Sequence, residues 1–496
     1  MRSTTFPVFL AGAFFATGIA ADTCETLRTN TDIKVAGELR SEYFNRWYWS
    51  TTCKALKPSC VLVPTSTAEV VDIINILKDT DEPFAIKSGG HNPNPHFASV
   101  EGGPLISMEK MDDVTLDEKA LTVRVGPGNR WDDVIGALDG TGYTVVGGRL
   151  GHVGVGGLLL GGGLSFLSAQ YGWAANSIVA YEVVLPNATV VTASASQHPD
   201  LFLALKGGGN NFGVITAFHL RAYPQGEIWG GAMTFTHSKK TQAKLLAAVR
   251  DFTEYCEDEK AGLILVNARA TEVLLDVWIL FTFYDAPEPP AGIFDNFTDA
   301  KPILDTSGTK SYKKLLSEGN AGVIENTAYT ITTETMPLPN AENGAVVLGA
   351  IHDRWRKTGS AAVMKTVGDS FNVAYQPFTK RMAKIARESG GDMLDIDDDV
   401  DRIIIDYNYS HLFRSQHAVI DVATSETSSG TGELIDRFEA DGRLPKVYRP
   451  LFMNDAYFRQ DYWGRLKPER RELAKKVVAN VDPEGMWKSR TGGFKP

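Results

Sequence analysis

The sequence concentrates glycine in one short stretch, where a ligand could be bound through the main chain. Nine of the seventeen residues from Gly147 to Gly163 are glycine, and no Asp, Glu, Lys or Arg occurs between Leu150 and Tyr181. Glycine lets main-chain N–H groups approach a bulky anion or a flat ring, because no Cβ stands in the way. We interpret this stretch as a backbone cradle for a ligand. The alternative is a glycine turn packed between buried strands.

Two more glycine loops lie beside predicted strands. The segment Lys87–His91 (KSGGH) ends a strand, so its amides can form an anion-binding nest with His91 at its mouth. A lone histidine is more often an ordinary core or surface residue, but the flanking glycines favour a functional role. The third loop, LKGGGNNFGVIT, enters a strand at Val214. The chain contains neither G-x-G-x-x-G nor a P-loop, so a dinucleotide would not be held in the Rossmann manner.

Composition excludes several classes of protein. The 496 residues are 43% hydrophobic and 22% charged, which is typical of globular proteins and excludes disorder, collagen and a simple coiled coil. The net charge is -10, whereas a nucleic-acid binder needs a basic face, so we expect no nucleic-acid partner. The glycine stretch would make a poor apolar helix, so we expect no membrane partner either. We also expect no metal site, because no H-E-x-x-H occurs and the calcium-like spacing of Asp395–Asp399 lacks the glycine and the glutamate that a calcium loop needs.

The apolar patterns predict an α+β protein with two lobes. From Cys60 to Pro224, short apolar strands alternate with helices, and Ser66 can cap a helix with apolar residues at helical spacing. Residues 225–446 alternate strands and helices again. The tail that follows contains a predicted helix from Pro468.

Two features of the chain indicate its compartment: its first residues and its cysteines. Residues 1–21 are typical of a secretory signal peptide, with Arg2 followed by an apolar stretch and small residues; the alternative is an uncleaved anchor. An even number of cysteines in a secreted chain suggests two disulfides, and four cysteines allow three connectivities. The four are Cys24, Cys53, Cys60 and Cys256.

Three sequons are candidate glycosylation sites: Asn187, Asn296 and Asn408. Asn187 lies in VVLPNATVVTA, which predicts a hairpin with Pro-Asn at its tip, where a glycan would meet solvent.

In chain order, the segments resemble the FAD-linked oxidoreductases of the vanillyl-alcohol oxidase and berberine-bridge-enzyme type, especially their secreted fungal members. The resemblance is carried by PSCVLVPTSTAEV, KSGGH, TVRVGPGNRWDDV, VGVGGLLLGGG, HPDLFLALKGGGNNFGVIT, NDAYF and DPEGMW. It implies an α+β fold in which a PCMH-type FAD-binding domain from both chain ends is roofed by an α/β substrate lobe. The implied segments are a signal peptide (1–21), FAD-binding domain (22–224, PCMH core about 56–224), substrate-binding domain (225–446) and C-terminal segment (447–496).

The same resemblance assigns cofactor contacts. His91 would carry FAD covalently through the flavin 8α-methyl group. Bicovalent members have a cysteine where this chain has Leu150, so we expect a single covalent link. Lys87 stands where many members have arginine, which keeps the charge but loses the fork. The other implied contacts are Ser88, Gly89, Gly90, Asn92, Gly154, Val155, Gly156, Gly157, Gly161, Gly162, Gly213, Val214 and Asn454.

The catalytic base departs from the family pattern. Members with a tyrosine base carry Y-x-N-Y near the C-terminus, whereas this chain reads Phe452-Met453-Asn454-Asp455. Asn454 matches the flavin-facing asparagine, and Asp455 occupies the tyrosine position. Burial would raise the pKa of Asp455 from its usual ~3.9 toward that of a working base. The alternative is that Asp455 caps a following helix.

The strand DRIIIDYNYS offers substitute bases. Tyr407 and Tyr409 share one of its faces, while Asp406 and Asn408 share the other. If Asn408 is glycosylated, its face points outward and the tyrosines point toward the flavin. The alternative is that they are ordinary half-buried strand aromatics.

The resemblance also pairs Cys24 with Cys60, which leaves Cys53 to pair with Cys256. Such a bond would join the two lobes.

Together these inferences predict a secreted, monomeric FAD-dependent oxidase. A substrate C–H next to O or N would give hydride to flavin N5, and O2 would take the electrons to give H2O2. The expected partners are O2 and a small molecule, either a sugar or oligosaccharide, or a secondary-metabolite alcohol or amine. Two alternatives remain: an oxidative cyclase of a secondary-metabolite pathway, and a secreted flavin-binding homologue without turnover.

Overall fold

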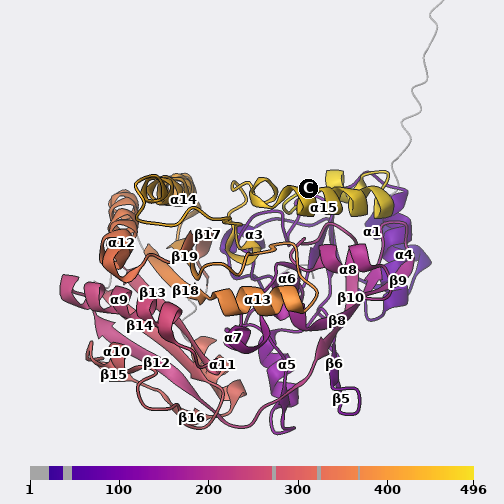
Figure 1. The fold of residues 1–496 in the computed structure, drawn as a ribbon. Coiled ribbons are helices and arrows are strands. Elements are labelled where there is room, and N and C mark those ends of the chain that lie inside the picture. Colours follow the sequence, from indigo (N-terminus) through magenta and orange to yellow (C-terminus); the bar gives the residue numbers. More distant parts are fainter. Residues whose placement is uncertain (1–21, 37–46, 271–274, 321–325, 367–368) are drawn as a thin grey trace, which may run out of the picture.

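The computed structural model describes residues 22–36, 47–270, 275–320, 326–366 and 369–496. The predicted signal peptide, residues 1–21, lies outside these ranges. Within them the chain forms two lobes that lie side by side (Figure 1). Each lobe combines sheets with packed helices, which confirms the predicted α+β class.

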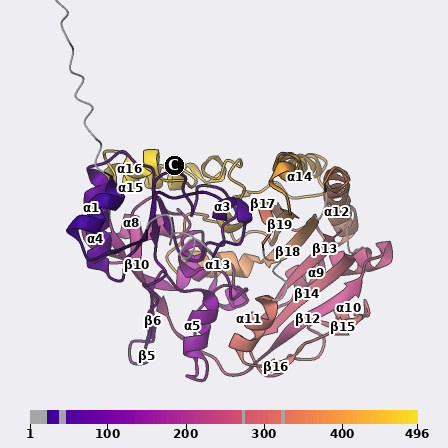
Figure 2. The same cartoon turned by 180° about the vertical axis from the view of Figure 1, so that it is seen from behind.

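Two sheets form the centre of the first lobe. One has the strand order β1-β2-β4-β3 and the other the order β5-β6-β10-β8-β9. Helices α1 and α4 pack together on the outer side of this lobe, which Figure 2 shows from behind. The elements are α1 Thr23–Asn30, β1 Lys34–Ala36, α3 Thr51–Lys54, β2 Cys60–Val63, α4 Thr67–Lys78, β3 Ala85–Lys87, β4 Pro104–Ser107, β5 Val114–Asp117, β6 Thr122–Val125, α5 Trp131–Leu138, β7 Tyr143–Thr144, α6 Val155–Leu160, α7 Ser168–Tyr171, β8 Ile178–Val184, β9 Val190–Ser194, α8 Pro199–Leu205 and β10 Val214–Arg221.

Helix α4 forms as its sequence predicts. The Ser66 side chain accepts a hydrogen bond from the Glu69 N–H at 3.3 Å, which satisfies one of the donors at the helix start. The apolar residues at helical spacing, Val70, Ile73, Ile74 and Leu77, are all fully buried.

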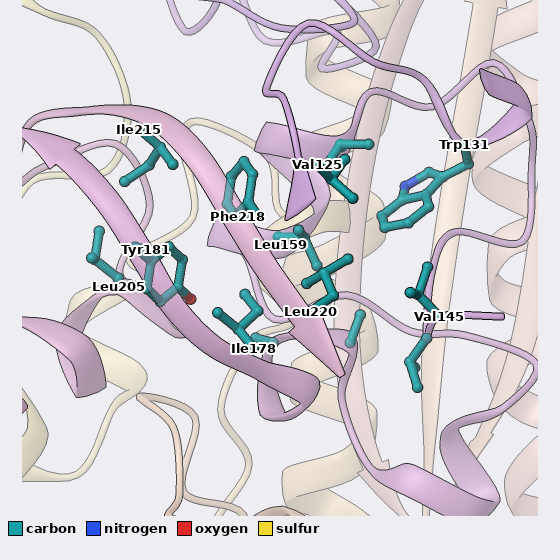
Figure 3. Packing of buried hydrophobic residues seen from close by; sticks show 14 of the residues in the cluster. Val125, Trp131, Val145, Leu159, Ile178, Tyr181, Leu205, Ile215, Phe218 and Leu220 are labelled. Atoms are coloured by element: carbon teal, nitrogen blue, oxygen red, sulfur yellow. The ribbon is translucent and has the colours of Figure 1, made fainter. Parts of the chain in front are cut away.

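The core of the first lobe fixes the glycine-rich helix α6. Leu159 of α6 packs in one cluster with Trp131 of α5 and with Phe218 and Leu220 of β10 (Figure 3). These side chains are fully buried, so their contacts hold α6 against the five-stranded sheet. The glycine stretch is therefore anchored from one side while its other side remains available for a ligand.

The second lobe is built on one large antiparallel sheet. Its strand order is β15-β12-β14-β13-β18-β19-β17, with β16 paired to β12. Before it, β11 Tyr223–Pro224 pairs with β7 of the first lobe. The elements of the second lobe are β12 Ile228–Thr236, α9 Lys239–Tyr255, β13 Ala261–Ala270, β14 Leu275–Tyr284, α10 Asp295–Thr298, β15 Leu304–Asp305, β16 Gly308–Lys310, α11 Tyr312–Asn320, β17 Ala328–Pro337, α12 Ala341–Val363, β18 Ser370–Phe378, α13 Lys380–Glu388, β19 Arg402–His411 and α14 His417–Ala440.

Helices α9, α12 and α14 cover one face of this sheet (Figure 1). On β13, Leu263 and Leu265 point into that covered side, while the alternate residues Ile264 and Val266 are half-buried on the other. The period of two thus separates a helix-packed face from a face that looks toward the first lobe.

The C-terminal residues return to the first lobe, where the yellow helices of Figure 1 lie along it. Helices α15 (Pro468–Val481) and α16 (Met486–Arg490) belong to this segment. Trp487 packs edge-on against Phe84, with ring centroids 5.2 Å apart, and Arg490 donates to the Leu77 carbonyl at 2.7 Å.

One predicted disulfide is confirmed and the other is wrong. Cys24 is bonded to Cys60. Cys53 and Cys256 are free. The Cys53 thiol lies 3.2 Å from the Pro93 carbonyl in the first lobe, whereas Cys256 follows helix α9 in the second, so the predicted bond between the lobes does not form.

Asn187 lies exposed in the turn of an antiparallel hairpin whose register pairs Val184 with Val190, which confirms the predicted hairpin. Asn296 is exposed in α10. In the described part of the chain, no helix has the length and apolar character needed to cross a membrane.

Candidate active site

A cavity of about 470 Å³ lies between the lobes. Its floor comes from the KSGGH loop, helix α6 and the third glycine loop, and its roof from the uncovered face of the large sheet. The predicted cofactor residues that line it are Ser88, Gly89, Gly90, His91, Asn92, Leu150, Gly154, Gly156, Gly157, Gly213, Val214 and Asn454. The other predicted contacts do not line it: Lys87, Val155, Gly161 and Gly162.

The floor is built by close contact between two loops. The Ser88 hydroxyl donates to the Pro127 carbonyl at 2.6 Å and accepts from the Gly156 N–H at 3.1 Å. A Cβ on Gly154 would lie 2.3 Å from the Gly89 nitrogen, so neither backbone could approach the other with a side chain present. These contacts require glycine at both positions.

His91 lines the cavity beside an aromatic ring. Its imidazole stacks on Trp49 with ring centroids 4.5 Å apart and an angle of 5° between the planes. Burial, together with the charges of Arg130 and His152, lowers the pKa of His91 to about 3. The imidazole is therefore neutral at ordinary pH and retains a nitrogen lone pair.

The C-terminal segment is tied to the floor through Asn454. Its side chain donates to the carbonyls of Gly157 at 3.1 Å and Leu158 at 3.2 Å, and accepts from the Gly163 N–H at 3.1 Å. This asparagine thus closes the end of helix α6, although it comes from residues almost three hundred positions later.

Asp455 follows directly and its carboxylate enters the cavity. Gln376 of β18 donates to Asp455 Oδ2 at 2.9 Å, and Arg149 donates to the oxygen of the same Gln376 amide. Burial raises the pKa of Asp455 to about 6, although the Gln376 hydrogen bond and the Arg149 charge act in the opposite direction. Asp455 ends a 3-10 turn, Met453–Asp455, and no helix follows at once, so the capping alternative is wrong.

A second carboxylate lies in the roof. Asp406 of β19 accepts from Asn408 Nδ2 at 2.7 Å, and burial followed by the charge of Asp455 raises its pKa well above the usual value. Within the described residues, neither Asp406 Oδ1 nor Asn408 Oδ1 has a hydrogen-bond partner, although both are buried. Both residues line the cavity and so offer acceptors to a bound molecule.

The predicted orientation of β19 is therefore wrong. The Tyr407 hydroxyl forms a hydrogen bond with the Thr431 hydroxyl at 3.0 Å, and the Tyr409 hydroxyl forms one with the Thr427 hydroxyl at 2.6 Å. Both threonines belong to α14. The tyrosines are packed under the covering helices and do not reach the cavity as bases. Asn408 is only 8% exposed and faces the cavity, so it does not present a glycan to solvent. The alternative of ordinary strand aromatics is the correct one.

Sequence reasoning missed Arg149, Gln376 and Asp406. Arg149 lies inside the glycine stretch, two residues before Gly151. Its charge among so many glycines is the signal that could have identified it. Gln376 and Asp406 lie on neighbouring strands of the roof, and only the pairing of β18 with β19 brings them together.

Another part of the roof is apolar. Side chains from two neighbouring strands, β13 and β14, form this part of the lining: Ile264, Val266, Ala268, Ile279 and Phe281. The cavity thus has an apolar strip beside a polar end made by Arg149, Asp455 and Asp406.

The residues of the floor fit FAD. The two loops meet where side chains would collide, and a Cβ on Gly157 would meet nothing within 4 Å, so the backbone is open toward the cavity at that point. Ser88, Gly89 and Gly154 would hold the cofactor from below, and His91 stands at the side with a free lone pair.

Comparisons with known proteins agree with this geometry. Residues 58–194 match the model of the FAD binding domain family. An uncharacterized FAD-linked oxidoreductase of Arthroderma benhamiae is 39% identical over 451 residues, which cover 90% of this chain and 89% of the relative. The FAD-dependent monooxygenase tpcD of Cochliobolus heterostrophus is 30% identical, with 96% and 94% of the two chains covered.

Solved structures share the fold. Glucooligosaccharide oxidase from Acremonium strictum, described with a 6-S-cysteinyl, 8α-N1-histidyl FAD, superposes with a TM-score of 0.76 at 16% identity, covering 95% of this chain and 98% of that one. Berberine bridge enzyme from Eschscholzia californica gives 0.74 at 16% identity, covering 96% and 99%. The chain belongs to the FAD-linked oxidoreductases and has the fold of berberine bridge enzyme.

Proposed function

We propose that this enzyme is an oxidase that removes hydride from a carbon next to O or N in a largely apolar small molecule and passes the electrons to O2. The observation that carries the proposal is Asp455, a buried carboxylate that faces the cavity between the glycine floor and the roof. The bound FAD supplies the hydride acceptor and then reduces O2 to H2O2.

Asp455 acts as the base that takes the substrate's hydroxyl or amine proton while the adjacent C–H bond breaks. Gln376 and Arg149 hold the carboxylate through Oδ2. Oδ1 receives no hydrogen bond from the described residues and is the atom that accepts the proton. A base with a pKa of about 6 is ionised in neutral solution and is still basic enough to accept a proton.

The roof selects the substrate. The apolar strip on β13 and β14 binds the carbon skeleton and excludes water, while Asp406 Oδ1 and Asn408 Oδ1 accept hydrogen bonds from donor groups. This arrangement favours an apolar alcohol or amine, as in secondary metabolism, over a sugar with hydroxyls on every side.

FAD is held covalently by His91 alone, because Leu150 lines the cavity without a thiol. Acid-precipitated parent protein should stay yellow, with flavin on the peptide that contains His91. His91→Ala should release its flavin into the acid supernatant. Flavin found on a cysteine peptide would contradict this part of the proposal.

The test of function is a panel of apolar alcohols, amines and oligosaccharides scored by anaerobic bleaching of the flavin. An oxidase should then form one H2O2 per oxidised substrate on admission of air. Bleaching by oligosaccharides but by no apolar compound would contradict the proposed substrate class. A flavin that no compound bleaches would favour a binding protein without turnover.

A second candidate is a monooxygenase, which the name of the 30% identical relative from Cochliobolus heterostrophus favours. It would place one oxygen atom of O2 into the product. Turnover under ¹⁸O2 separates the two, because only a monooxygenase gives labelled product and sub-stoichiometric H2O2.

The protein's setting is also part of the proposal: a secreted monomer, cleaved after residue 21, with glycans at Asn187 and Asn296. The exposure of both asparagines and the Cys24–Cys60 bond support it. The proposal also keeps the predicted FAD-binding domain (22–224), substrate-binding domain (225–446) and C-terminal segment (447–496). Sequencing the N-terminus of secreted protein, with mass analysis after glycan removal, would test the first two points.

A further inference from the structure

A short segment before the first glycine loop links the two lobes beside His91. In this strap, defined as residues 47–53, the Trp49 N–H donates to the Gly90 carbonyl at 3.0 Å. Two residues later, the Thr51 N–H donates to the Thr327 carbonyl at 3.0 Å, just before β17. The strap is therefore fixed to the KSGGH loop on one side and to the roof on the other.

Three rings form a column through this strap. The Trp49 indole lies almost parallel to the His91 imidazole at 4.5 Å, and its opposite face stacks on Tyr329 at 4.1 Å and 25°. Tyr329 is itself held by β17, whose N–H at this residue donates to the Ser50 hydroxyl at 2.9 Å. Both rings that flank Trp49 line the cavity, as does Trp49 itself.

The column is the contact that sets the plane of the His91 ring. Among the described residues, no group forms a hydrogen bond with either ring nitrogen of His91. A face-to-face contact opposes rotation of the imidazole about its bond to Cβ, because turning the ring would drive its edge into the indole. The neutral ring has its lone pair at any ordinary pH, so orientation is the property that the protein must still supply.

We propose that Trp49 is a positioning residue for covalent flavin attachment, holding the His91 ring so that a nitrogen lone pair points at the flavin 8α-carbon. This inference rests on the proposed attachment at His91. In that step a bond forms between the imidazole nitrogen and the 8α-carbon, one C–H bond of the 8α-methyl group breaks, and two protons leave. The electron pair of that C–H bond reduces the flavin, and O2 reoxidises it with formation of H2O2.

The experiment follows attachment rather than turnover. Full-length chain produced under riboflavin limitation is mixed with FAD, and samples are acid-precipitated over time. Covalent flavin is read as fluorescence of the protein band on a denaturing gel. Trp49→Leu removes the flat ring and should slow attachment about 10- to 100-fold, because misorientation of a reacting group has a cost of that order. Trp49→Phe keeps a stacked ring and should stay within about threefold of the parent.

Trp229→Leu is the matched control. Trp229 is likewise partly buried and stacked, on Phe294 at 5.4 Å and 18°, but it lies outside the cavity lining. It should attach FAD at the parent rate. Non-covalent FAD binding, measured by flavin fluorescence before attachment, gives the occupancy to which each attachment rate is normalised.

Attachment at the parent rate in folded Trp49→Leu would overturn this inference. If that variant does not fold, Tyr329→Leu decides instead: loss of the ring behind Trp49 should slow attachment about two- to tenfold, and a parent rate would overturn the inference equally. If the parent itself releases all its flavin in acid, the attachment at His91 has failed, and the role of Trp49 fails with it.

Discussion

The two walls of the cavity are built in different ways. The floor is made by main chain: Gly89 and Gly154 are in contact at distances that a side chain would forbid. The roof is made by side chains from alternate positions of a sheet, such as Val266 on β13 and Asp406 on β19. Main-chain binding suits a cofactor that never changes, whereas side chains on a fixed sheet can be exchanged without moving the backbone.

The largest expected effect concerns the polar end, where the C-terminal segment meets the roof. Asp455→Asn keeps the shape of the side chain and removes the base, so flavin reduction by substrate should fall about 10²–10⁴-fold. Stopped-flow absorbance under anaerobic conditions measures it, with flavin content as a check on folding. A parent rate in this variant would exclude Asp455 as the base.

The carboxyl of Asp455 also determines how the rate of flavin reduction should depend on pH. Asp455 must be ionised to accept a proton, and its pKa is raised to about 6. The parent's flavin reduction rate should therefore be constant at higher pH and fall as the pH drops through about 6. A profile that is flat from pH 4 to 8 would contradict the assignment.

The next largest effect is expected from a substitution in the floor of the cavity. Gly157→Ala adds a methyl group that meets no protein atom within 4 Å, yet it projects where the cofactor is proposed to lie. In a His91→Ala background, where binding is reversible, it should weaken FAD binding about tenfold or more by overpacking. Gly349→Ala in α12, also without neighbours, is the control and should bind normally. Equal affinity in both would place the cofactor elsewhere.

A change to the apolar roof should act on the substrate alone. Val266→Asn places an amide in the apolar strip and should raise KM about tenfold while kcat and flavin content change little. Val277→Asn, on the same face of the sheet but outside the cavity lining, should leave KM unchanged. If both variants bind substrate like the parent, the strip does not contact it.

The smallest expected effect concerns the far face of β19. Tyr409→Phe removes a buried hydrogen bond to Thr427 and should lower the free energy of unfolding by about 0.5–1.5 kcal/mol. Turnover should not change, because the phenol points under α14. Denaturant unfolding and stopped-flow reduction measure the two quantities. A loss of flavin reduction without loss of stability would return Tyr409 to the active site.

This difference between the walls also explains what could be predicted from sequence. The floor could be predicted from the sequence because close contact between backbones demands glycine, and because His91 directly follows two glycines. On β19 the period of two was correct, but alternation alone does not say which face is covered by helices. The buried face carries hydroxyls that bond to Thr427 and Thr431, so polarity gave no guide. Gln376 beside Asp455 required tertiary pairing that no local pattern contains.

The bridge made by Asn454 has a consequence for synthesis. The glycine helix it closes is made early, but the asparagine emerges from the ribosome only after nearly three hundred further residues. The Asn211 side chain likewise waits for the Phe494 carbonyl, which it meets at 2.8 Å. The floor is therefore incomplete until Asn454 and Phe494 have emerged, so we expect FAD to bind only after that point. A ribosome-bound chain from which Asn454 has not yet emerged should carry a folded second lobe and no flavin.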